Sequence, residues 1–145
     1  MTQQSSADAA LYTTSASAHG GRAGHVDSED GQLNVRLAVP TELGGDGGAG
    51  STPEQLFAAA LAASFESAMG AVARAENYPE FGVMGVRATT ALLKNGDAHD
   101  LTAVLDITLP GLTRDRAEHL VDQGQHICAF SRALKGKIDY RLHDA

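Results

Sequence analysis

The alternation of apolar and polar residues predicts short strands at the start of the chain. Residues 11–19 (LYTTSASAH) alternate weakly and carry the β-branched and aromatic residues that favour strands. After a Gly20-Gly21 turn, residues 25–28 form a second candidate strand. Residues 32–39 (QLNVRLAV) alternate cleanly, with leucine and valine on one face. The three segments predict an antiparallel meander.

A long apolar helix is predicted after a glycine-rich loop. Five of the sixteen glycines lie in residues 44–50, and Ser51 or Thr52 can then cap a helix that has Pro53 in its first turn. From residue 55 to about residue 75 the sequence is apolar on nearly every face and rich in alanine. This pattern predicts a central helix that is buried on most faces and that another backbone can approach closely.

The second half of the chain predicts a hairpin, a helix and a last strand. Residues 83–93 and 101–109 read as paired strands joined by residues 94–99. A second helix is expected to open near Thr113 and to run to about Cys128.

Residues 138–142 complete the order βββ-α-ββ-α-β, which predicts an α+β domain. We expect a single domain over residues 11–145 and a flexible N-terminus over residues 1–10.

Composition narrows the partners and the compartment. The net charge of −7 argues against a nucleic-acid partner, because binding phosphates requires a clustered basic face. The first residues lack a basic segment followed by an apolar run, so no secretory signal is predicted and a cytoplasmic location is expected. The uncharged apolar run of residues 56–65 is about half of the roughly 20 residues that span a bilayer, so no membrane partner is expected.

Three familiar chemistries do not fit the motifs. The six histidines lack metal-ligand spacing, so no metal is expected. The glycine-rich loop lacks the lysine of a phosphate-binding loop. Ser64 lacks the flanking glycines of a hydrolase nucleophile elbow and falls inside a helix. Arg22, Glu54, Ser64 and Cys128 remain as candidates, although each also fits an ordinary structural role.

A family resemblance distinguishes these four residues from ordinary ones. Three segments carry it: GGR at 20–22, ELGGDGGAGSTPEQLFAA at 42–59 followed by AASF at 62–65, and HICAFSRALKGKIDY at 126–140. In order and spacing they resemble the organic hydroperoxide resistance family, within the wider Ohr/OsmC group. The resemblance extends over residues 11–142.

The resemblance implies a fold and an activity. Family members are intertwined homodimers with antiparallel sheets around two central helices. They reduce organic and fatty-acid hydroperoxides with a cysteine thiolate, which becomes a sulfenic acid and then forms a disulfide with a second cysteine. A lipoylated protein reduces that disulfide, so the implied reductant is an external dithiol and no bound cofactor is expected.

The resemblance assigns roles to individual residues of this chain. Arg22 and Glu54 match the pair that activates the thiolate, and Cys128 matches the resolving cysteine. Ser64 stands where the peroxidatic cysteine should be, ten residues after Glu54. Around Cys128, Gln125, Ala129 and Phe130 replace the usual His, Pro and Tyr.

The serine predicts a loss of activity, because its hydroxyl has no accessible anion at neutral pH and cannot store an oxidation as a sulfenic acid. On an unbroken helix, Glu54 and Ser64 would lie about 15 Å apart along the axis. Unless the helix breaks, we therefore expect Glu54, with Arg22, to reach the Ser64 of the other subunit across a dimer interface. The serine at position 64 is compatible both with natural divergence and with an introduced substitution.

Two other functions are compatible with the residues. A non-catalytic paralogue would bind a hydrophobic ligand in a pocket lined by Phe57, Phe65 and Phe130. A thiol sensor would act through Cys128 alone. The sensor is the weaker hypothesis, because the predicted position of Cys128 near a helix C-terminus disfavours a thiolate.

Overall fold

The computed structural model describes residues 9–78 and 84–144. These residues form two compact units, of which the first ends at Pro53 and the second begins at Glu54. Most of the predicted flexible N-terminus and Val83, the first residue of the predicted hairpin, lie outside the described residues, and the expectation of one domain stays a prediction.

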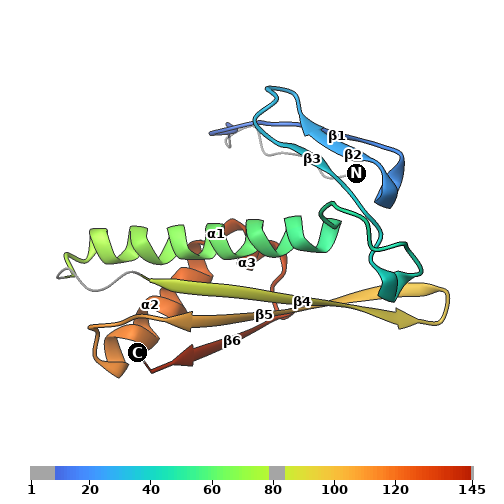
Figure 1. Cartoon of the computed structure of the whole chain (residues 1–145). Helices are drawn as coiled ribbons and strands as arrows, with labels where there is room; N and C mark the ends of the chain where they lie inside the picture. The colour runs from blue at the N-terminus through green and yellow to red at the C-terminus, as the bar shows by residue number, and fades with distance from the viewer. Residues whose placement is uncertain (1–8, 79–83, 145) are drawn as a thin grey trace. The chain divides into compact units, whose positions relative to one another are not determined.

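The first unit contains the predicted meander. Strands β1 (Ala16–His19), β2 (His25–Ser28) and β3 (Asn34–Arg36) pair antiparallel in that order (Figure 1). Strand β2 has the predicted bounds, whereas β1 begins five residues later than predicted, at Ala16. Among the described residues before it, 9–15, which include the exposed Leu11 and Tyr12, none lies in a strand.

Two 3-10 turns shape the first unit. The turn η1 (Gly21–Ala23) joins β1 to β2, and it requires Gly24, because a Cβ there would lie 1.8 Å from the carbonyl oxygen of His19. The turn η2 (Thr41–Leu43) starts the glycine-rich loop. A parallel bridge between Leu37 and Ser51 closes the base of this loop, which brings the chain back to the start of the long helix.

The second unit is built on a sheet of three strands, β4 (Gly85–Asn95), β5 (Ala98–Thr108) and β6 (Ile138–His143). Strands β4 and β5 form the predicted hairpin, but with a two-residue turn at Gly96 and Asp97, in which Gly96 adopts a φ of 62°. Strand β6 pairs with β5 in parallel. The sheet is therefore mixed and not wholly antiparallel as expected, because a helical crossover precedes β6.

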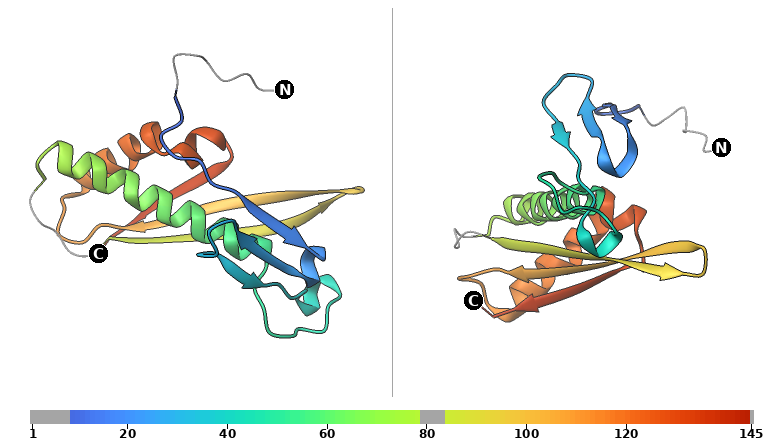
Figure 2. Two further views of the ribbon diagram at one scale, coloured as in Figure 1. Left: turned by 90° about the horizontal axis from the view of Figure 1, so that it is seen from above. Right: turned by 45° about the vertical axis from the view of Figure 1, so that its right-hand side comes forward.

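Three helices complete the second unit. The helix α1 (Pro53–Ala75) is unbroken, and in Figure 1 and both views of Figure 2 it lies along the β4-β5-β6 sheet. The crossover between β5 and β6 contains α2 (Arg114–Ile127) and the short α3 (Ala129–Ala133). The predicted α+β order is confirmed, with α3 as an addition that five residues are too few to reveal by periodicity.

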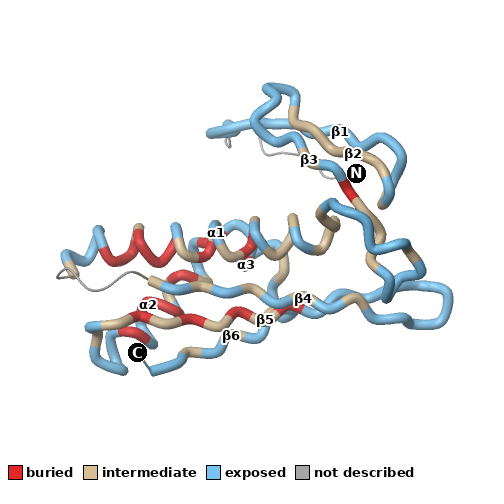
Figure 3. The backbone as a smooth tube through the Cα atoms, viewed as in Figure 1, coloured by how far each residue is buried: buried red, intermediate tan, exposed pale blue. Residues whose placement is uncertain are grey.

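The core of the second unit lies between one face of the sheet and the helices (Figure 3). Alternate residues of β5 are buried, and Phe65 and Met69 of α1 are completely buried beside them. The helices α1 and α2 approach closely at Gly124, where a Cβ would lie 3.0 Å from Cγ of Met69 and 3.2 Å from the Phe65 ring. This crossing fixes α2, and with it the residue that follows α2, against α1.

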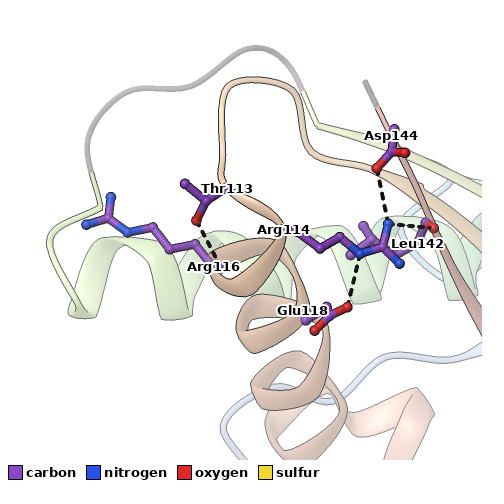
Figure 4. Close-up of polar contacts among 6 residues, drawn as sticks. All are labelled: Thr113, Arg114, Arg116, Glu118, Leu142 and Asp144. Atoms are coloured by element: carbon purple, nitrogen blue, oxygen red, sulfur yellow. Dashed lines mark hydrogen bonds and ion pairs between the residues drawn. The ribbon is translucent and has the colours of Figure 1, made fainter.

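Polar contacts hold the start of the crossover (Figure 4). The Thr113 hydroxyl accepts a hydrogen bond from the Arg116 amide at 3.3 Å and caps α2. Arg114 pairs with Glu118 at 3.0 Å and with Asp144 at 3.2 Å, and donates to the Leu142 carbonyl. The start of α2 is thereby tied to the end of β6.

The helix α1 is less buried than its composition predicts. Seven of its 23 residues are buried, and Ala59, Ala63 and Ser67 are exposed along one side. The prediction of burial on most faces is therefore wrong for a single copy of the chain. By length and composition α1 could cross a membrane, a test that the central helices of soluble proteins also pass, and 33% of its apolar stretch is buried.

Candidate active site

Two of the predicted site residues meet in the second unit. Ser64, half-buried in the middle of α1, places its Oγ 3.4 Å from Sγ of Cys128. Cys128 is 2% exposed and is the only cysteine in the chain. The contact joins residues 64 positions apart in sequence, and it depends on the close crossing of α1 and α2 at Gly124.

The backbone around Cys128 favours its thiolate. Cys128 ends α2 and is also the N-cap of α3. Burial raises the pKa of the Cys128 thiol, but hydrogen bonds from Ser64, from the amide and hydroxyl of Ser131 and from the Phe130 amide lower it, so that the pKa lies below its usual value. Cys128 lies at the C-terminus of α2 as predicted, but the hydrogen bonds from its neighbours favour the thiolate there.

A tyrosine extends this set of contacts. The Tyr140 hydroxyl on β6 donates to Oγ of the buried Ser131 at 2.7 Å. Burial raises the pKa of Tyr140, the hydrogen bond to Ser131 lowers it, and the nearby Cys128 raises it further. Sequence reasoning missed Ser131 and Tyr140, because the short helix α3, which places Ser131 beside Cys128, gives no periodic signal.

Glu54 and Arg22 are placed differently. Glu54 lies in the first turn of α1, and because α1 is unbroken, Glu54 and Ser64 are about 15 Å apart along the helix axis. A glutamate side chain does not span that distance, so Glu54 does not reach the Ser64 of its own chain. Arg22 lies in η1 of the first unit.

The three phenylalanines predicted to line one pocket occupy different environments. Phe65 is 0% exposed and packs on Tyr140, with the ring centroids 5.3 Å apart, so it fills the core. Phe57 lines a cavity of about 560 Å³ together with Leu101 and Leu134. Phe130 is 37% exposed at the surface. Phe57 alone of the three lines this cavity.

The described residues contain no side-chain cluster suited to a metal ion. Within residues 9–78 and 84–144, no group of three or more His, Cys, Asp or Glu side chains is arranged to hold a metal ion. The chemistry available at the contact of Ser64 and Cys128 is that of one hydroxyl and one thiol whose pKa is lowered.

The hydroxyl of Ser64 is expected to control the pKa of Cys128. Replacing Ser64 by Ala removes a donor to the thiolate, so the pKa of Cys128 should rise. The measurement is the pH dependence of iodoacetamide alkylation, with Ser67→Ala as the control, since Ser67 is exposed on α1. An identical alkylation midpoint in the two variants would contradict the expectation.

The same shift has a consequence for stability. The pKa of the folded Cys128 lies below that of the unfolded chain. The thiolate therefore stabilises the fold at pH values above the unfolded pKa, and this contribution is lost as the pH falls through the folded pKa. The Ser64→Ala variant should show a smaller rise of unfolding free energy across that range.

The helix α1 lies on a mixed sheet, and the crossover between β5 and β6 returns to α1 at Cys128, which is the arrangement of an OsmC-like fold. An OsmC-like protein family model matches residues 44–143, so the chain belongs to the OsmC-like family. Within it, an organic hydroperoxide resistance protein of Xanthomonas axonopodis pv. citri is 39% identical over 132 residues, which cover 91% of this chain and 93% of that protein.

Other relatives carry the same description. Organic hydroperoxide resistance protein-like 2 of Staphylococcus saprophyticus is 40% identical and covers 91% of this chain and 94% of its own length. The crystal structure of an organic hydroperoxide resistance protein from Legionella pneumophila superposes with a TM-score of 0.85 at 40% identity, over 94% of this chain and 99% of that chain. The resemblance stated from the motifs is thereby confirmed.

Proposed function

We propose that the chain is a member of the hydroperoxide-reducing thiol peroxidases whose turnover is silenced at Ser64. The observation that carries the proposal is the 3.4 Å contact between Ser64 and Cys128. A peroxidatic and a resolving cysteine must meet to form a disulfide, and these two side chains do meet. The contact supports a two-cysteine site in which one sulfur is replaced by oxygen.

The chemistry explains why the exchange stops turnover. A thiolate attacks the terminal oxygen of the hydroperoxide, so that the O–O bond breaks and the sulfur becomes a sulfenic acid. The leaving alkoxide is protonated and released as an alcohol. A second thiol then condenses with the sulfenic acid and releases water, and an external dithiol, such as a lipoylated protein, reduces the disulfide. The Ser64 hydroxyl supplies neither the anion nor the second oxidation state at neutral pH.

The test compares peroxide consumption by the unaltered chain with consumption in buffer alone. With an organic hydroperoxide and a dithiol, we expect no catalytic consumption of peroxide above the buffer rate. Cys128→Ser is the control, because this variant has no thiol that peroxide could oxidise even once. Multiple turnovers by the chain with Ser64 would contradict the proposal.

We further propose that the protein is a cytoplasmic homodimer that forms through the exposed side of α1. Ala59, Ala63 and Ser67 recur every four residues there, which lets a second helix approach closely. Since Glu54 is too far from its own Ser64, it would act with Arg22 on the Ser64 of the partner chain.

Sedimentation should detect a particle of two 15.0 kDa chains. Ala59→Arg should shift it toward the monomer, whereas Thr89→Arg on the exposed side of β4 should not. A monomer in the unaltered protein would contradict the dimer.

A non-catalytic ligand-binding role is the second candidate. The observation that favours it is the cavity of about 560 Å³, in which Phe57, Leu101 and Leu134 line the wall beside the polar His99, Asp100 and Lys137. A hydrophobic ligand bound there should shift the amide resonances of Leu101 and Leu134. No shift on addition of a long-chain alcohol would remove this candidate.

A further inference from the structure

A second cavity lies on the crossover, away from α1. It has a volume of about 370 Å³, and its lining comes from the end of α2, from α3 and from β6. We name it the crossover cavity and define it by six lining residues: His126, Ser131, Arg132, Lys135, Ile138 and Tyr140. Its volume falls within the roughly 300 to 1,000 Å³ typical of ligand pockets.

The charge of the crossover cavity is opposite to that of the whole chain. The chain has a net charge of −7, yet residues 123–138 contain no Asp or Glu and include Arg132 and Lys135. Neither of the two cations faces a carboxylate among the lining residues. The flanking Asp139 is exposed and pairs with Arg141 at 3.0 Å. The cavity therefore offers two cationic side chains to an anion.

The cationic side of the cavity is partly fixed in position. Nη1 of Arg132 donates to the His126 carbonyl at 3.1 Å, which ties the guanidinium to the end of α2. A guanidinium carries five N–H donors, so this bond leaves donors for a ligand. Nδ1 of His126 donates to the Asp122 carbonyl at 2.8 Å, which orients the imidazole at the rim.

The opposite wall is apolar. Ile138 and Tyr140 alternate with exposed residues along β6 and are half-buried. The Tyr140 hydroxyl is engaged with Ser131, so the ring, not the hydroxyl, is what Tyr140 offers to a ligand. A cationic rim beside an apolar wall fits an amphipathic anion better than an inorganic one.

We propose that the crossover cavity binds a small organic acid, with its carboxylate at Arg132 and Lys135 and its hydrocarbon part on Ile138 and Tyr140. The site is separate from the contact of Ser64 with Cys128, although Ser131 touches both. A bound acid would therefore lie next to the hydroxyl that donates to the Cys128 thiol. The proposal does not rest on the peroxidase proposal.

The test is calorimetric titration of the full chain with octanoate, acetate and inorganic phosphate. Octanoate should bind, and acetate should bind roughly tenfold more weakly or worse, because it lacks the buried methylenes. Arg132→Gln/Lys135→Gln should weaken octanoate about tenfold or more, since two charge-assisted hydrogen bonds are lost. Lys94→Gln, at an exposed lysine of the β4-β5 hairpin, is the control and should leave the affinity unchanged.

Two further measurements keep the result unambiguous. Arg132→Lys/Lys135→Arg retains both charges and should retain most of the affinity. In the unaltered chain, octanoate should shift the amide resonances of Ser131 and Ile138. This measurement tests the site even if the glutamine variant does not fold. Equal affinity for phosphate and octanoate, shifts confined to the residues around Phe57, or unchanged affinity in a folded glutamine variant would each overturn the proposal. No peroxide is present, so the outcome is independent of turnover at Ser64.

Discussion

Ser64→Cys is expected to give the chain a dithiol-dependent hydroperoxide reductase activity. The new sulfur would lie close to Sγ of Cys128, from which the present oxygen is 3.4 Å away, and a disulfide requires about 2.05 Å, which a modest local movement provides. The lowered pKa of Cys128 keeps the second thiol reactive toward a sulfenic acid. Peroxide consumption should exceed that of the Ser64 chain by on the order of a hundredfold or more, because covalent catalysis by a thiolate becomes available.

Two controls separate the steps of this reaction. Ser64→Ala matches the substitution without a nucleophile and should stay at the background rate. Ser64→Cys/Cys128→Ser should stop after one oxidation, as a sulfenic acid that a dimedone reagent traps. Mass spectrometry of oxidised Ser64→Cys should show the loss of two hydrogens for the new disulfide. Background activity in a folded Ser64→Cys protein would reject the reductase proposal and favour the ligand-binding role.

Phe65→Ala is expected to be the most damaging single substitution in the core. Phe65 is completely buried, contacts the Tyr140 ring and lies against Gly124. Truncating a buried phenylalanine costs roughly 3 to 5 kcal/mol, which is a large part of the about 5 to 15 kcal/mol that stabilises a typical domain. Urea denaturation should show this loss as a lower midpoint with an unchanged slope.

The matched control for this prediction is Phe65→Leu. It keeps most of the apolar volume, so it should cost less than about 2 kcal/mol. Because Phe65 neighbours Ser64, the alanine variant should also disturb the contact with Cys128, which iodoacetamide alkylation would detect as faster modification of a less buried thiol. A loss below about 1 kcal/mol would mean that the core closes around the missing ring.

Much of the fold could be predicted from local pattern. Strand β2 has its predicted bounds, and α1 begins at Pro53, where the capping residues and the proline indicated a helix start. The failures share a cause. Residues 11–15 have strand composition but lie outside every strand, and nothing in the alternation around Ile138 reveals that β6 runs parallel to β5. Pairing partners and strand direction are non-local properties.

The candidate site also depends on non-local contacts that sequence patterns do not reveal. Cys128 and Ser64 are separated by 64 residues, and no spacing rule joins them. Their association was predicted from the family resemblance alone. The lowered pKa of Cys128 could not be predicted either, because it depends on Ser64 and Ser131, which only the fold brings next to the thiol.

Gly124 has a consequence for how this sequence can diversify. Because a side chain there would meet Met69 and Phe65, position 124 can grow only where position 65 or 69 becomes smaller. In an alignment of relatives, these three positions should therefore vary together. The distance between the positions of Ser64 and Cys128 depends on that joint variation, so three core positions without chemistry of their own limit which relatives can bring two thiols together.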